Sequence, residues 1–351
     1  MRSLSIAQGT QLLTIGDVIE LGQAADAMRR KLHPGNVVTF IIDRNINYTN
    51  VCRSECRFCA FYRKAGHKDA YVLPETVILN KIQETVAAGG TQIMLQGGLN
   101  PALDINYYTS LLTTIKKNFT ITIHSFSPAE VLFIAKQTGI SVSETLRRLQ
   151  AAGLDSLPGG GAEILVDRVR QHVSPKKISA GDWLTVMEEA HRIGLKTTAT
   201  MVIGMGETYA ERLEHMDKVR RLQEKTGGFR AFIIWSYQPG NTELGGEKTS
   251  TWDYLKTLAV ARLYLDNIEH MQGSWVTQGQ NTGQLTLAFG ANDLGSIMLE
   301  ENVVRAAGTA YDMSVNKMVE IIRGAGKIPA QRDTNYTILK VFGADNEFTK
   351  S

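Results

Sequence analysis

Residues 50–62 read Asn50-Val51-Cys52-Arg53-Ser54-Glu55-Cys56-Arg57-Phe58-Cys59-Ala60-Phe61-Tyr62. Cys52, Cys56 and Cys59 are the only cysteines among 351 residues, and they fall within a single short segment. Buried structural cysteines behave as small hydrophobic residues and need not gather on one segment. The spacing Cys-x3-Cys-x2-Cys therefore predicts a set of metal ligands.

The identity of the metal depends on what completes its coordination. Structural zinc takes four protein ligands, usually in two separated pairs, and this chain has no second pair. The nearest spare ligand is His67, in a stretch next to Gly66 and Lys68 that we expect to be solvated. A [4Fe-4S] cluster held by three thiolates leaves one iron open to a small molecule. We favour that open cluster over zinc, a disulfide or free thiols.

Composition is that of an ordinary globular protein and excludes some classes of function. The chain has 38 Lys and Arg, 35 Asp and Glu, a net charge of +3 and 43% hydrophobic residues. Because the basic residues are mixed with acidic ones, we expect no nucleic-acid partner. We see no signal peptide and no apolar run long enough to cross a membrane. Three cysteines without partner pairs favour a reducing compartment, and the cytoplasm is the expectation.

The rest of the chain alternates between short apolar strands and amphipathic helices. A helix over 13–31 precedes the first strand, and a long helix over 251–270 follows the sixth. Alternation of this kind predicts right-handed crossovers and a parallel sheet. We expect a (βα)8 barrel of the TIM type, with an open sheet as the alternative. The expected strands are 37–42, 92–95, 120–123, 154–157, 196–203 and 231–234, then 274–277 and 284–289, with 336–339 as an added strand or cap.

The same pattern predicts how the chain is divided. We expect an N-terminal helical extension over 1–36, the barrel over 37–310, and a C-terminal helix and strand over 311–351 that pack on the barrel. In a barrel of this kind the functional residues follow the strands, at their carboxyl ends. The cysteine segment follows the first expected strand, which places the ligands at that end.

Glycines follow the second and fifth expected strands. Glycine lets the backbone approach a ligand without a Cβ in between. Gly97 and Gly98 would provide carbonyl groups for an ammonium group, and Gly204 would allow approach to an adenine face. The alternative at each site is a tight turn.

Polar side chains follow the other strands. Glu163 would bind ribose hydroxyls or, alternatively, serve as an acid at a helix N-terminus. Arg168 would face the same ligand as Glu163 and pair with a carboxylate, or else be solvated. His124 would bind substrate or carry a proton, or be a satisfied interior histidine. Asp293 would reach substrate at the barrel mouth or cap a helix.

Together these residues resemble the radical SAM enzymes of the futalosine route to menaquinone, and among them the cyclic dehypoxanthinyl futalosine synthases. The likeness covers roughly residues 37–342. Aminofutalosine synthases and deazaflavin synthases share much of the pattern. The matching stretches are 45–52, 59–63, 95–98, 153–165, 238–242 and 290–296.

The resemblance implies a [4Fe-4S] cluster that binds S-adenosylmethionine at its fourth iron. Cys52, Cys56 and Cys59 match the cluster ligands, and Phe58 matches the aromatic residue beside the adenine. Gly97 and Gly98 match the loop for the methionine amine, although Leu99 stands where an acid is usual. Glu163 and Arg168 resemble the ribose and carboxylate contacts of the family.

The implied reaction is a radical cyclisation of dehypoxanthine futalosine. A 5'-deoxyadenosyl radical takes hydrogen from C4' of the ribose, the carbon radical attacks the benzoate ring, and a base removes the last proton. His124 and Asp293 are the candidate bases. The resemblance also implies a reductant such as flavodoxin or ferredoxin. The alternatives are an aminofutalosine synthase, a deazaflavin synthase-type enzyme, an iron-sulfur electron carrier or sensor, and a zinc-stabilised binding barrel.

Overall fold

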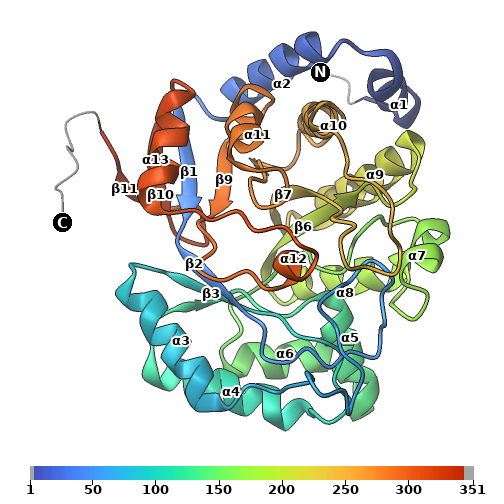
Figure 1. Cartoon of the computed structure of the whole chain (residues 1–351), viewed down its shortest axis with the longest axis vertical. Helices are drawn as coiled ribbons and strands as arrows, with labels where there is room; N and C mark the ends of the chain where they lie inside the picture. The colour runs from blue at the N-terminus through green and yellow to red at the C-terminus, as the bar shows by residue number, and fades with distance from the viewer. Residues whose placement is uncertain (1–3, 344–351) are drawn as a thin grey trace.

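The computed structural model describes residues 4–343, which form a ring of parallel strands surrounded by helices (Figure 1). β1 (Val37–Ile41) and β2 (Asp43–Ile46) form one strand that is interrupted at Ile42. β2 pairs with β3 (Gln92–Leu95), and β3 pairs with β4 (Thr122–Ile123). A bridge between His124 and Ser156 joins β4 to the next strand. The ring continues through β5 (Ser156–Leu157), β6 (Lys196–Ile203), β7 (Phe229–Ser236), β8 (His270–Gln272) and β9 (Asp293–Ser296), which pairs with β1.

The (βα)8 barrel is confirmed, because the ring closes when β1 and β2 are taken as one strand. Side chains along a strand point alternately to its two faces. On β6, Thr198 and Thr200 face the interior of the ring, whereas Ala199 and Met201 are buried on the other face. The main outer helices are α3 (Glu75–Ala87), α4 (Ile105–Asn118), α5 (Pro128–Thr138), α6 (Val142–Ala152), α8 (Ala180–Arg192), α9 (Tyr209–Thr226) and α10 (Thr251–Tyr264).

The N-terminal extension is helical as expected, but it contains two helices. α1 (Ile6–Ile15) ends at Gly16, and α2 (Val18–Leu32) begins after Asp17. The Asp17 carboxylate accepts hydrogen bonds from the backbone N–H groups of Ile19 and Glu20, which caps α2 and separates it from α1. Figure 1 shows α2 beside α10 and α1 beside α9 and α10, and these pairs are in contact. Among residues 4–343, no helix is both long enough and apolar enough to span a bilayer.

Two expected strands, 274–277 and 284–289, are wrong. The second run is helical, in α11 (Gln280–Leu285) and the 3-10 helix η1 (Thr286–Ala288), because an apolar run of this length fits a buried helix as well as a strand. The seventh and eighth strands of the ring are instead β8 and β9. The helix expected over 251–270 ends at Tyr264, which leaves room for β8.

The C-terminal segment closes the end of the barrel where the strands start. After the short α12 (Val303–Ala306), α13 (Val315–Gly324) leads to β10 (Ile328–Arg332), which pairs with β1, and β11 (Ile338–Val341) pairs with β10. The strand expected over 336–339 is therefore displaced, and β10 was not expected. The segment 332–336 leads from β10 toward β11. It contacts β3 through Thr334, β8 through Tyr336 and β9 through Arg332. We call this segment the barrel floor.

Candidate functional site

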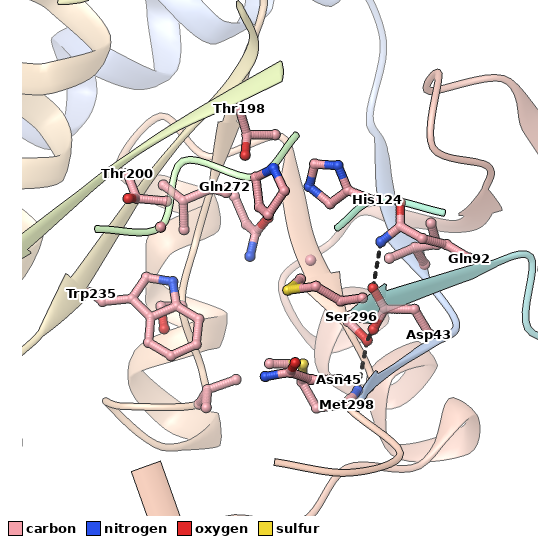
Figure 2. Close-up of a pocket in the computed structure, with 18 of the residues that line it drawn as sticks. Asp43, Asn45, Gln92, His124, Thr198, Thr200, Trp235, Gln272, Ser296 and Met298 are labelled. Carbon is pink, nitrogen blue, oxygen red and sulfur yellow. Dashed lines mark hydrogen bonds between the residues drawn. The ribbon is translucent and has the colours of Figure 1, made fainter. Parts of the chain in front are cut away.

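A cavity of about 240 Å³ lies inside the barrel above the floor (Figure 2). Its wall combines polar side chains from the strands with apolar ones such as Met94, Ile233 and Trp235. The Asp43 carboxylate accepts hydrogen bonds from Gln92, at 2.5 Å, and from the Ser296 hydroxyl. Burial raises the pKa of Asp43. The polar part of the wall consists of Asp43, Asn45, Gln92, Gln96, His124, Glu163, Thr198, Thr200, Arg230, Gln272, Ser274, Ser296, Arg332, Thr334 and Tyr336.

The cysteine segment follows β2 at the opposite end from the floor. The Cys52 N–H donates to the Arg63 carbonyl, and the Leu99 N–H donates to Cys52 Sγ at 3.3 Å. Cys56 and Cys59 line a second hollow of about 340 Å³. Burial raises the pKa of the Cys56 thiol to about 12 and also raises that of Cys59. A positive partner such as a metal is therefore needed to hold these sulfurs as thiolates.

Lys177 links the cysteine segment to the main cavity. Its ammonium group lies 2.7 Å from Glu163 Oε1, in the cavity wall, and 5.5 Å from the centre of the Phe58 ring. Burial alone would lower the pKa of Lys177, but the Glu163 carboxylate raises it above its usual value. Lys177 therefore stays charged between the sulfurs and the cavity.

Glu163 and Arg168 do not meet. The Glu163 carboxylate pairs with Lys177 and, at 3.3 Å, with Arg170. The helix that follows, α7 (Asp167–Val173), begins too late for Glu163 to lie in its first turn, so the helix-terminus alternative is wrong. Arg168 is 58% exposed and bridges to Glu211 at 2.6 Å. The position beside Glu163 that we expected for Arg168 is occupied by Arg170.

The three candidate glycines are each required by the local packing. A Cβ on Gly98 would lie 2.2 Å from the Val51 carbonyl oxygen, and one on Gly97 would lie 2.5 Å from the Tyr48 ring. Gly98 thus lets the end of β3 approach the cysteine segment, and Gly97 lets it approach the Tyr48 ring just before that segment. Gly204 has a φ of +95°, in the left-handed region that favours glycine.

His124 faces the cavity and is neutral. Its Nδ1 lies 2.7 Å from the Ser156 hydroxyl, which donates its single proton to the Lys196 carbonyl. Nδ1 must therefore carry the proton, and Nε2 has a free lone pair. Burial lowers the pKa of His124 well below its usual value, with smaller contributions from the Arg230 and Arg332 charges. Within the described residues, Nε2 has no hydrogen-bond partner, so His124 is not a fully satisfied interior histidine.

Asp293 is buried in an ion pair instead. It is the first residue of β9, it is fully shielded from solvent, and its Oδ2 lies 2.6 Å from Arg332 Nε. The Asp293 carboxylate also accepts hydrogen bonds from the Thr39 hydroxyl and from the Gly295 N–H. Burial would raise the pKa of Asp293, but the Arg332 guanidinium holds it below its usual value. Asp293 neither caps a helix nor lines the cavity.

Comparison with known proteins identifies the family. Residues 46–219 match the radical SAM superfamily, and residues 226–344 match the CofH/MqnC C-terminal region. A cyclic dehypoxanthine futalosine synthase from Halalkalibacterium halodurans is 52% identical over 97% of this chain and 92% of its own. The chain belongs to the cyclic dehypoxanthine futalosine synthase family.

More distant relatives of this family have other names or share only its fold. An aminodeoxyfutalosine synthase from Thermus thermophilus is 37% identical over 97% of this chain and 94% of its own. The crystal structure of a methylornithine synthase superposes with a TM-score of 0.72 at 20% identity, over 94% of this chain and 95% of that one. At this level of identity, that structure supports the barrel fold alone.

The cysteine segment of this futalosine synthase family member suits a cluster better than one ion. Three thiolates around tetrahedral zinc would lie roughly 3.8 Å apart, given a Zn–S bond of about 2.3 Å. In the described part of the chain the three sulfurs do not all lie within 4.8 Å of one another, so at least one pair is farther apart than that. The wider spacing fits a cubane, and the Leu99 N–H that points at Cys52 Sγ is of the kind that tunes iron-sulfur clusters.

Several cavity residues of this family member were not found from the sequence. Asp43 follows the apolar strand directly, so its position was a usable signal. Arg230 immediately precedes the strand expected over 231–234, and Arg332 ends β10, which was not expected. Neither arginine stands out in the sequence, because only the closed barrel brings them together.

Proposed function

We propose that this protein is a radical SAM cyclase that converts dehypoxanthine futalosine to cyclic dehypoxanthinyl futalosine. The observation that carries the proposal is the cysteine segment at the carboxyl ends of the barrel strands, above a cavity lined by both polar and apolar side chains, in a chain 52% identical to a synthase of that name. An electron carrier needs no such cavity, and a single zinc ion does not suit the sulfur spacing.

The cofactors would be held by residues at the strand ends. Cys52, Cys56 and Cys59 would ligate a [4Fe-4S] cluster, and Phe58, Gly97, Gly98, Glu163 and Gly204 would surround S-adenosylmethionine. Arg168, which is exposed and bridges to Glu211, would take no part. When bound, these groups supply a 5'-deoxyadenosyl radical that removes hydrogen from the substrate ribose. A small reduced protein such as flavodoxin or ferredoxin would be the electron donor.

The protein's own role is to position the substrate, exclude water and accept a proton. Ring closure onto the aromatic ring leaves one proton to be lost, and His124 Nε2 offers a lone pair inside the cavity. Asp43 is a second acceptor, since its carboxylate lines the cavity and burial raises its pKa. Asp293 acts as a positioning residue, because its carboxylate is engaged by Arg332.

The test is anaerobic reconstitution with iron and sulfide, followed by reductant, S-adenosylmethionine and dehypoxanthine futalosine. We expect free 5'-deoxyadenosine and a product that has lost two hydrogens relative to the substrate, one to the adenosyl radical and one as the proton and electron released when the ring regains aromaticity. A product that retains the adenosyl group would favour an aminofutalosine synthase. If the electron paramagnetic resonance spectrum of the reduced cluster does not change when S-adenosylmethionine is added, the result would favour an electron carrier.

A further inference from the structure

The described part of the cavity wall contains two cationic side chains, and they differ in their partners. Arg332 is neutralised by Asp293, at 2.6 Å. Arg230, from the start of β7, donates to the Asn335 side-chain oxygen at 2.7 Å and to the Ser156 hydroxyl, both neutral. Within residues 4–343 no carboxylate oxygen lies within 4.0 Å of its guanidinium nitrogens. Arg230 is therefore a half-buried cation without a carboxylate partner at that distance.

The hydrogen bonds of Arg230 are also incomplete. A guanidinium has five N–H groups, and the protein uses two of them here. Its Nε is shielded from solvent and has no partner in the described structure. Burial and the Arg332 charge lower the pKa of Arg230 to about 10, against contributions from Tyr336 and Asp333 that raise it. An unpaired buried charge is costly, and an anion beside the guanidinium would offset that cost.

A fully buried arginine, Arg262, shows what a purely structural arrangement looks like. Arg262, on α10, also lacks an ion pair, and burial lowers its pKa to about 9. All three of its nitrogens donate to protein oxygens, mainly the backbone carbonyls of Gly290, Ile268 and Glu269. Arg262 does not line the cavity, whereas Arg230 does. Of these two arginines, only the one that lines the cavity, Arg230, has a guanidinium nitrogen without a protein acceptor among the described residues.

We infer that Arg230 binds the aryl carboxylate of the substrate; this inference rests on the proposed function, whose substrate carries one benzoate group. β7 runs six residues beyond Arg230 to Ser236, roughly 20 Å at about 3.3 Å per residue, so Arg230 lies far below the cysteine end. The carboxylate would lie near the floor, the aromatic ring between Met94 and Trp235, and the ribose toward the cysteines.

The same placement explains the neighbouring polar groups. Ser156 accepts hydrogen bonds from both His124 Nδ1 and Arg230 Nη2, so one hydroxyl holds the proposed base and the proposed anchor in a fixed relation. Asn335, on the floor, holds the other side of the guanidinium. The C-terminal segment thus contributes to substrate orientation without touching the cofactor.

The experiment compares the substrate acid with its neutral carboxamide in wild type, Arg230→Gln and Arg230→Lys. We expect Arg230→Gln to raise Kd and KM for the acid by roughly 10- to 100-fold and to lose the preference for acid over amide. Arg230→Lys keeps the charge, so it should keep that preference with a smaller rise in KM. Iron and sulfide content and the circular dichroism of both variants report whether they fold and load the cluster.

Arg220→Gln is the matched control, because Arg220 pairs with Asp266 on the outside of the barrel and does not line the cavity. The inference is overturned if Arg230→Gln prefers the acid as strongly as wild type does. If wild type binds or converts neither compound, the proposed function itself fails. The two failures are therefore distinct.

Discussion

The two ends of the barrel are held together in different ways. At the cysteine end, backbone contacts from Arg63, Leu99 and Val173 shape the segment, and burial disfavours the charged form of Cys56. At the floor, the side chains of Arg332 and Asp293 neutralise each other within the fold. The cysteine end thus depends on a bound group for its charge balance, whereas this pair at the floor needs none. Substitutions at the cysteine end should therefore reduce cofactor loading, and substitutions at the floor should reduce stability.

The largest expected effect follows replacement of any one of Cys52, Cys56 or Cys59 by alanine. Each variant should lose the brown colour of the reconstituted protein and all cleavage of S-adenosylmethionine, because two thiolates do not hold an open cluster. The floor ion pair is untouched, so thermal unfolding of the apo protein should remain cooperative. Iron and sulfide content, absorbance and product analysis measure this. An alanine variant that still cleaves the cofactor would contradict the ligand assignment.

The next largest effect is at the floor, in Asp293→Asn. Loss of the carboxylate leaves Arg332 buried without its partner, and we expect a loss of about 3–5 kcal/mol in the free energy of unfolding. Cluster loading should survive, and turnover should fall because Arg332 lines the cavity. Denaturant unfolding of the apo protein and iron content measure the two effects.

An exposed ion pair provides the control for this prediction. Glu144→Gln removes the partner of Arg148, on the surface of α6, and should cost less than about 1 kcal/mol. If Asp293→Asn costs no more than Glu144→Gln, the floor does not depend on its ion pair.

The same contrast explains what was predictable from the sequence. The cysteine end was found because its ligands lie on one segment and because apolar strands β1, β3, β6 and β7 precede the loops. The floor was missed because its contacts join residues distant in sequence, such as Arg332 with Asp293. Asp293 was expected to reach substrate because it follows an apolar run, yet that run is helical in α11 and η1. Local pattern identifies a loop, but it does not identify the partner of a buried charge.

A smaller effect is expected where Gly98 meets the cysteine segment. Gly98→Ala would place a Cβ 2.2 Å from the Val51 oxygen and 2.7 Å from Cys52 Cβ, so the segment must shift. We expect a loss of about 1–3 kcal/mol in stability, together with a weaker cluster. Gly181→Ala, at the exposed start of α8, has room for its methyl group and should be neutral or stabilising. Equal cluster loading in both variants would show that the close approach at Gly98 is not required.

The smallest expected effect concerns pH and links the cavity to stability. His124 is neutral when folded because burial lowers its pKa well below 6.5, whereas an unfolded histidine takes up a proton below about pH 6.5. The unfolded state therefore binds more protons as the pH falls, and stability is lost below pH 6.5. At pH 5.5 this loss is about 1.4 kcal/mol for one such histidine. His124→Asn removes this pH-dependent loss. The difference in the free energy of unfolding between wild type and variant should therefore shrink by about 1.4 kcal/mol from pH 7.5 to 5.5.

His215→Asn separates this effect from catalysis. Burial lowers the pKa of His215 to about 3, and its Nδ1 accepts the Leu165 N–H outside the cavity. Its pH effect on unfolding should match that of His124→Asn, because both histidines stay neutral when folded. Only His124→Asn should lower turnover at pH 7.5, since only His124 offers a lone pair to the substrate. Equal turnover in the two variants would leave Asp43 as the acceptor of the last proton.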